Sequence, residues 1–238
     1  MSGHSRWAKI HRQKGVADAA RGNLFTKVSK NISLSARSGG DPEMNFALKL
    51  AIDKAKECNM PKDKIENAIK RGTGELGGAV LEEVLYEAYA PSGAPLLITG
   101  ITDNKNRTTP EIKALLNKNG GSLGAQNSVQ WMFERKGVVR LNLENVQDKD
   151  TLLLEAIDFG AEDVLEEDSG LTVLTSFTNF EKVKKELEKK GSKIDYAEIE
   201  WVAKDKVKGE GAEVEKIENL VEKLEEHDDV NSVFTNVL

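Results

Sequence analysis

At 238 residues the chain is longer than a typical single domain of about 100–150 residues, so we expect more than one hydrophobic core. Its 39% hydrophobic and 31% charged residues suit a soluble globular protein, and no stretch approaches the ~20 apolar residues of a membrane helix or has the pattern of a secretory signal. We therefore expect a cytoplasmic protein without a membrane span. Cys58 is the only cysteine, which excludes an intrachain disulfide and a multi-cysteine metal site.

Charge is divided unevenly along the chain. The whole chain has a net charge of −6, but residues 1–40 contain eight Lys or Arg against one acid, Asp18, for a net charge of +7, which leaves −13 for residues 41–238. A basic segment on an acidic body is typical of nucleic-acid-binding proteins, because Lys and Arg neutralise phosphates. A solvated helix that happens to be basic is the alternative.

The first 78 residues predict an arm and a helical domain. Residues 1–15 are polar and basic without helical periodicity, so we expect a flexible arm there and a helical domain over 16–78. Asp41 and Pro42 suit a helix start, and Gly72 suits a helix end. The expected helices are 16–37, 41–58 and 61–72. The apolar face of the first consists of Phe25, Val28, Ile32 and Ala36.

Beyond the helical domain, the spacing of the apolar residues changes from that of helices to that of strands. We expect strands at 84–89, 96–101 and 129–133 and a helix at 109–118. This sheet is one helix and one strand short, while a helix from residue 211 and a strand at 230–237 have no other partners. We therefore expect 79–134 and 206–238 to form one α/β domain.

Residues 135–205 predict a second α/β domain, inserted into the first. Their elements follow the order strand, helix, strand, strand, helix, strand, which is the ferredoxin-like unit. The expected strands are 138–143, 163–165, 171–176 and 194–202, and the expected helices are 149–159 and 180–190. The predicted fold class is thus α+β, with an N-terminal three-helix domain and two α/β ferredoxin-like domains, one inserted in the other.

Few residues suit catalysis. The three histidines, His4, His11 and His227, have neither metal-ligand nor catalytic-triad spacing, and Glu57 beside Cys58 opposes thiolate formation. Acidic clusters such as 225–229 lack the spacing of a cation loop and are expected to be solvated surface. We therefore expect a protein that is not an enzyme and that needs no metal and no cofactor.

Cations and flat rings predict a nucleic-acid-binding surface instead. Lys and Arg contact phosphates, while Trp7 and His11 can stack on exposed bases. Trp7 could alternatively pin the arm to the body, cations at the end of the third helix could serve only the helix dipole, and Arg107 with Asn104 could contact a phosphate or cap a helix. The candidate binding residues are Arg6, Trp7, Lys9, His11, Arg12, Lys14, Arg21, Lys27, Lys30, Arg37, Lys70, Arg71 and Arg107.

Several motifs together resemble the YebC/PmpR family over nearly the whole chain. They are GHSRWAKI at 3–10, DAARGNLFTKVSK at 18–30, SARSGGDPEMN at 35–45, AIDKAKECNMPKDKIENAIKRGTGE at 51–75, TDNKNRT at 102–108, GGSLG at 120–124 and DDVNSVFTN at 228–236. The resemblance implies a three-domain protein with a helical first domain and two α/β domains. Members are generally named probable transcriptional regulators that bind DNA, and others, including mitochondrial relatives, are translation factors that ease synthesis of proline-rich stretches.

Two nucleic-acid partners therefore remain open. A DNA-binding transcriptional regulator would need an element that reads base edges, and the sequence has no helix-turn-helix signature. A ribosome-associated translation factor, bound to rRNA or tRNA, suits a basic arm on an acidic body. A protein-interaction scaffold is a third class, and the oligomeric state is open, with a monomer favoured.

The arm gives a prediction that separates phosphate contact from base stacking. The logarithm of affinity falls linearly with the logarithm of salt concentration, and each duplex phosphate contact adds roughly 0.9 to the steepness of that slope. Changing Lys9, Arg12 and Lys14 to Ala should therefore make the slope shallower by about two to three units. Trp7→Ala should instead weaken single-stranded RNA binding by ~1–3 kcal/mol with little change in slope. Filter binding across a salt series measures both effects. A lower melting temperature and equal weakening for RNA and duplex DNA would identify Trp7 as a structural anchor.

Overall fold

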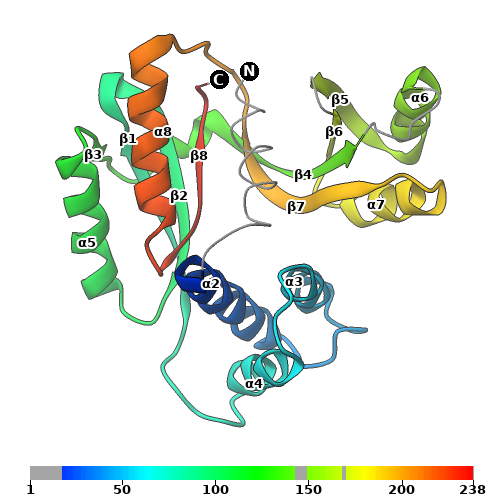
Figure 1. The fold of residues 1–238 in the computed structure, drawn as a ribbon, viewed down its shortest axis with the longest axis horizontal. Helices are drawn as coiled ribbons and strands as arrows, with labels where there is room; N and C mark the ends of the chain where they lie inside the picture. Colours follow the sequence, from blue (N-terminus) through cyan, green and yellow to red (C-terminus); the bar gives the residue numbers. More distant parts are fainter. Residues whose placement is uncertain (1–17, 143–148, 168–169, 238) are drawn as a thin grey trace. The chain divides into compact units, whose positions relative to one another are not determined.

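The computed structural model describes residues 18–142, 149–167 and 170–237. The chain divides into two compact units, one comprising Trp131–Asp205 and the other the chain on either side of it. The fold is α+β, with an N-terminal helical region and two four-stranded antiparallel sheets (Figure 1). Among the described helices, none has the length and apolar character needed to cross a membrane.

The described part of the first unit starts with three helices: α2 (Asp18–Ala36), α3 (Phe46–Glu57) and α4 (Lys62–Gly72). Their shared core confirms the predicted apolar face of α2. The buried residues of this shared core are Val28, Ile32, Ala36, Leu48, Ala55, Met60, Ile65 and Ala68.

The predicted start of the second helix is wrong. Asp41 forms a turn, in which its side chain accepts a hydrogen bond from the backbone N–H of Glu43, and the helix begins only at Phe46. Asn45 is the cap, because its side-chain oxygen accepts from the backbone N–H of Leu48 at 3.1 Å.

Helix α4 ends at Gly72, as predicted, and the residue with positive φ that follows the helix is Gly74. A Cβ on Gly72 would lie 2.2 Å from the backbone oxygen of Ser33 and 2.6 Å from the Cβ of Ala36. The lack of a side chain therefore allows α4 to lie directly on α2, where the Ser33 hydroxyl donates to the Ala68 carbonyl at 2.8 Å.

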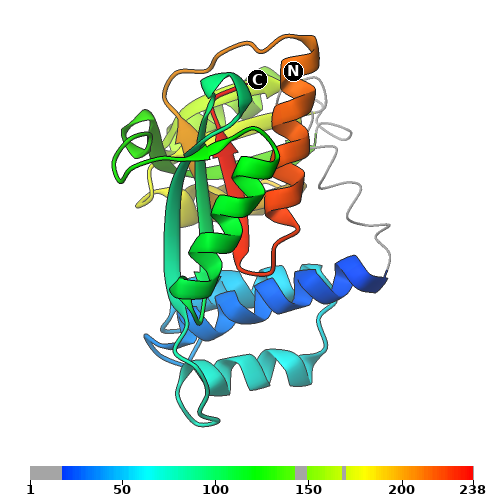
Figure 2. The same cartoon turned by 90° about the vertical axis from the view of Figure 1, so that its left-hand side faces the viewer.

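The rest of the first unit is a sheet with two helices on one face. Its elements are β1 (Glu82–Tyr89), β2 (Pro95–Thr102), α5 (Lys105–Lys118), β3 (Ser122–Leu123), α8 (Gly211–Glu225) and β8 (Val230–Thr235), with a 3-10 turn at Pro91–Gly93. The strand order is β3-β1-β2-β8, so the C-terminal strand completes the sheet beside β2. Helices α5 and α8 lie side by side over the sheet (Figure 2) and share its apolar core.

The predicted strand at 129–133 is wrong, and the reason is a buried carboxylate. Glu87 of β1 accepts hydrogen bonds from the backbone N–H groups of Asn127, Val129 and Gln130. Those donors are therefore not available to a strand ladder, and a 3-10 turn follows at Gln130–Met132. Burial alone would raise the pKa of Glu87, but these hydrogen bonds outweigh it and hold the pKa below its ordinary value.

The second unit has the ferredoxin-like order of elements. It contains β4 (Phe133–Asn142), α6 (Lys149–Phe159), β5 (Ala161–Glu167), β6 (Gly170–Thr175), α7 (Phe180–Lys189) and β7 (Ile194–Ala203). All pairings are antiparallel, in the order β5-β6-β4-β7. The first strand begins at Phe133, five residues before its predicted start, because its N-terminal half pairs with the end of β7.

The contact at Gly72 gives a prediction about stability. Gly72→Ala should destabilise the helical region by ~1–3 kcal/mol, because the added methyl group would force α4 away from α2. Hydrogen exchange of the amides of α2 and α4 measures the loss. Gly22→Ala is the matched control, since Gly22 lies in α2 with no atom of the described residues within 4 Å of its Cβ position, and it should be neutral or stabilising by up to ~1 kcal/mol. Equal effects of the two substitutions would contradict the close-approach explanation.

Candidate nucleic-acid interface

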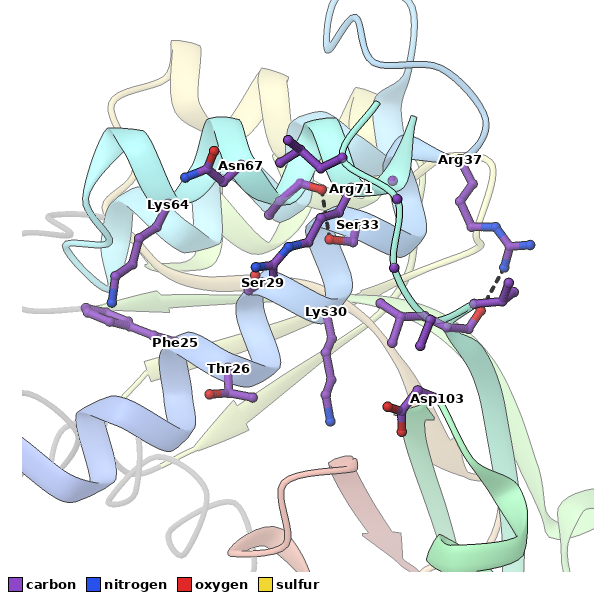
Figure 3. Close-up of a pocket in the computed structure, with 18 of the residues that line it drawn as sticks. Phe25, Thr26, Ser29, Lys30, Ser33, Arg37, Lys64, Asn67, Arg71 and Asp103 are labelled. Atoms are coloured by element: carbon purple, nitrogen blue, oxygen red, sulfur yellow. Dashed lines mark hydrogen bonds between the residues drawn. The ribbon is translucent and has the colours of Figure 1, made fainter. Parts of the chain in front are cut away.

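An open groove of about 930 Å³ runs between α2 and α4 (Figure 3). Gly74, residues 76–81 and Asp103 complete its lining. The α2 wall presents small and hydroxyl side chains, including Thr26, Ser29 and Ser33. The α4 wall presents Lys64, Asn67 and Arg71, which recur at the spacing of one helix face.

The groove is basic. Four cations line it, namely Lys30, Arg37, Lys64 and Arg71, against one acid, Asp103. Arg37 donates to the backbone carbonyl of Leu81 at 2.7 Å, and the Lys64 ammonium lies 5.4 Å from the centre of the Phe25 ring.

Lys64 and Arg71 are the groove cations best placed for an external anion. Both are exposed, and neither side chain makes a hydrogen bond or ion pair with another described residue. Asn67, exposed between them on the same helix face, adds an amide donor. The α4 wall therefore offers two charges and an amide to an anion, and the one internal contact described for them is that of Lys64 with the Phe25 ring.

Beside the groove lies a buried carboxylate, Asp229, whose side chain is only 3% exposed. Its oxygens accept hydrogen bonds from Lys30 at 2.5 Å, Arg107 at 2.7 Å, Thr108 at 2.6 Å and Thr102 at 3.1 Å. Burial alone would raise the pKa of Asp229, but the donors Lys30, Thr108 and Arg107 outweigh it and hold the pKa far below its ordinary value. The prediction that 225–229 is solvated surface is therefore wrong for Asp229.

Lys30 is one of three α2 residues that contact the turn between α8 and β8. Lys27 donates to the backbone carbonyl of Glu225, and Lys30 donates to that of Asp228 at 2.9 Å in addition to the Asp229 carboxylate. The Asn231 side chain donates to the Asn31 side-chain oxygen at 3.0 Å. These α2 positions, i, i+3 and i+4, form one face of the helix.

The predicted binding residues thus fall into three groups. The first lies outside the described residues, or has its side chain outside them: Arg6, Trp7, Lys9, His11, Arg12, Lys14 and Arg21. The second group makes contacts within the first unit, to Glu225 or to the Asp229 carboxylate: Lys27, Lys30 and Arg107. The third comprises Arg37 and Arg71, which line the groove, and Lys70, which is exposed in the last turn of α4 but does not line it.

Sequence reasoning left Arg107 and Asn104 with two roles, and the structure shows internal roles for both. Asn104 caps α5, its side-chain oxygen accepting from the backbone N–H of Arg107 at 3.2 Å. Arg107 then pairs with Asp103 and Asp229.

Other groove residues escaped notice. Lys64, Asn67 and Ser29 were missed, although the repeat of polar residues at 64, 67 and 71 on a predicted helix was a usable signal for the first two.

The buried Asp229 predicts a specific sensitivity to acid. A carboxyl whose pKa is lowered by folding stabilises the fold above its unfolded pKa of ~3.9, and that contribution is lost as the pH falls below this value. Between about pH 4 and pH 2, the unfolding free energy of the parent protein should fall more steeply with pH than that of Asp229→Asn. The difference in slope should be up to ~1.4 kcal/mol per pH unit, the value for one proton. Urea titrations at several pH values measure it, and parallel pH profiles for the two proteins would refute the assignment.

Comparisons with known proteins cover almost the whole chain. Residues 5–75 match the TACO1/YebC protein N-terminal domain, and residues 81–237 match the TACO1/YebC second and third domain. A crystal structure of a conserved hypothetical protein from Aquifex aeolicus is similar, with a TM-score of 0.84, 41% sequence identity, and coverage of 93% of this chain and 91% of that one.

Curated relatives extend over a similar length. A probable transcriptional regulatory protein of Thermoanaerobacter pseudethanolicus is 48% identical, covering 100% of this chain and 97% of the relative. A protein of the same description in Halothermothrix orenii is 49% identical over 99% of this chain and 94% of its own. With both domain matches and full-length relatives in agreement, the chain belongs to the TACO1/YebC family.

Proposed function

We propose that this protein is a non-enzymatic regulator of gene expression that binds DNA through its helical region. The observation that carries the proposal is the α2–α4 groove, with four cations and a single acid along it. Relatives described as probable transcriptional regulatory proteins support it.

The groove has the side-chain chemistry of phosphate contact. Lys and Arg, together with hydroxyl and amide donors such as Thr26, Ser29 and Asn67, are the groups that hold nucleic-acid backbones. The charge of the chain points the same way, because residues 41–238 carry −13 in total and would repel phosphates over most of their surface. Phosphate contact is therefore concentrated at the groove and the basic first 40 residues.

The absence of catalysis is part of the proposal. Among the residues that the structure describes, no three His, Cys, Asp or Glu side chains gather as a metal-binding group. The buried carboxylates of the described residues, Glu87, Glu200 and Asp229, each accept hydrogen bonds from two or more internal donors, which supports structural roles for them.

An RNA-binding translation factor on the ribosome, easing synthesis of proline-rich stretches, is the second candidate function. The observation in its favour is the four-stranded antiparallel sheet of the second unit, because RNA-recognition modules bind single strands on such a sheet. This support is an analogy at the level of the fold.

The groove cations allow a direct test of the proposed function. Replacing both Lys64 and Arg71 with Ala should weaken duplex DNA binding and make the salt slope shallower by roughly 1.8 units, since each lost phosphate contact accounts for ~0.9. Fluorescence anisotropy over a salt series gives affinity and slope together.

The matched control replaces Lys62 and Lys70, which lie on the same helix outside the groove. This pair removes the same charge and should change the slope by less than half as much. Equal losses from both pairs, or none from either, would overturn the groove assignment. Parallel titrations with single-stranded RNA, and co-sedimentation with ribosomes, decide between the two candidate functions.

A further inference from the structure

Within the first unit, polar side chains of α2 connect the helical region to the part that contains the sheet, which we call the sheet region. The apolar core of α2, α3 and α4 and the apolar core around β1, β2, β8, α5 and α8 are separate clusters with no residue in common. Between them, Lys27, Lys30 and Asn31 of α2 bind the α8–β8 turn by hydrogen bonds and one ion pair. We call these contacts the α2 joint. Polar contacts of this kind exchange with water at modest net cost, unlike the opening of an apolar core.

Lys30 belongs to both the α2 joint and the groove. It lines the groove, yet its ammonium is bound to the Asp229 carboxylate and the Asp228 carbonyl. Figure 3 shows its side chain extending from α2 on the side of Asp103, away from Asn67 and Lys64. In this arrangement, Asp229 neutralises a charge that the groove would otherwise offer to an anion.

Asp229 can release Lys30 without being left unpaired. Thr102 of β2 and Arg107 and Thr108 of α5 all come from the sheet region, so they remain in contact with the carboxylate whatever α2 does. A buried carboxylate that loses its only cation is costly, whereas this one keeps a guanidinium at 2.7 Å. The charge of Lys30 is likewise compensated if a phosphate takes the place of Asp229.

We propose that Lys30 exchanges between Asp229 and a nucleic-acid phosphate, so that nucleic acid in the groove opens the α2 joint. This inference rests on the proposed function and adds its regulation. The α2 joint then competes with the nucleic acid for Lys30. When the joint is closed, Lys30 is bound to Asp229, and when it is open, Lys30 joins the other cations of the groove. Because such coupling is reciprocal, weakening the joint must raise affinity for nucleic acid.

Two acids that are neighbours in sequence provide a matched pair of variants. Asp229→Asn removes the buried carboxylate that holds Lys30, whereas Asp228→Asn makes the same change of net charge at an exposed side chain. Asp229→Asn should bind a duplex DNA oligonucleotide at least about fivefold more tightly than Asp228→Asn, the low end of ordinary coupling. Equal affinities of the two variants would overturn the proposal.

A third variant keeps the proposal testable if Asp229→Asn does not fold, because that substitution also removes a partner of Arg107. Asn31→Ala breaks the hydrogen bond with Asn231 and leaves the groove cations and the Asp229 carboxylate in place. It should also tighten binding, by a smaller factor, and an unchanged or weaker affinity would count against the exchange.

Opening of the α2 joint can be measured directly in the full chain. Spin labels at Lys70→Cys and Glu222→Cys, both exposed positions, in a Cys58→Ser background report the distance between α4 and α8. Saturation with the oligonucleotide should lengthen or broaden that distance, and Asp229→Asn should show the broader distribution before any ligand is added. Asp228→Asn should resemble the parent.

The outcomes separate the exchange from the proposed function. Oligonucleotide binding that depends on Lys64 and Arg71 but leaves the distance unchanged overturns the exchange alone. If the parent protein binds neither duplex DNA nor single-stranded RNA, the exchange and the proposed function are both overturned.

Discussion

The Asp229 carboxylate is the point at which the first unit is held together. Its donors come from three segments: α2 through Lys30, the end of β2 through Thr102, and α5 through Arg107 and Thr108. The neighbouring backbone is equally constrained, because the Asp229 carbonyl accepts from the N–H of Ile101, and a Cβ on Gly100 would lie 2.1 Å from the same oxygen. The helical region, the sheet and its first helix thus depend on one buried negative charge.

Sequence periodicity predicted most elements because their information is local. The apolar spacing of Val28, Ile32 and Ala36 identified the buried face of α2, and the two unpartnered C-terminal elements indicated that they complete the first sheet. The errors came from side chains that act at a distance. No local pattern could show that Glu87 binds N–H groups about 40 residues further along the chain and so prevents a strand there.

The candidate site shows the same limit more clearly. The sequence marked Lys27 and Lys30 of α2 as candidate binding residues, but a helix face that lies outside one core can still be covered by another segment of the chain. Lys30 and Asp229 are 199 positions apart, so their pairing left no trace in the spacing of residues. The α4 wall was within reach of sequence reasoning, because Lys64, Asn67 and Arg71 recur on one face of a helix whose other face is apolar. What periodicity could not supply was the closeness of α2 and α4, which depends on the missing side chain of Gly72.

The second unit leaves and rejoins the first at positions that are both fixed to the first sheet. On the entry side, Glu87 holds the backbone of Val129 and Gln130, and on the exit side the N–H of Val207 donates to the Asn236 carbonyl at 2.8 Å. The described chain on either side, from α2 to β8, belongs entirely to the first unit. Tension applied between Asp18 and Val237 would therefore load the first unit alone, and the inserted sheet would bear force only after one of these two anchor points had broken.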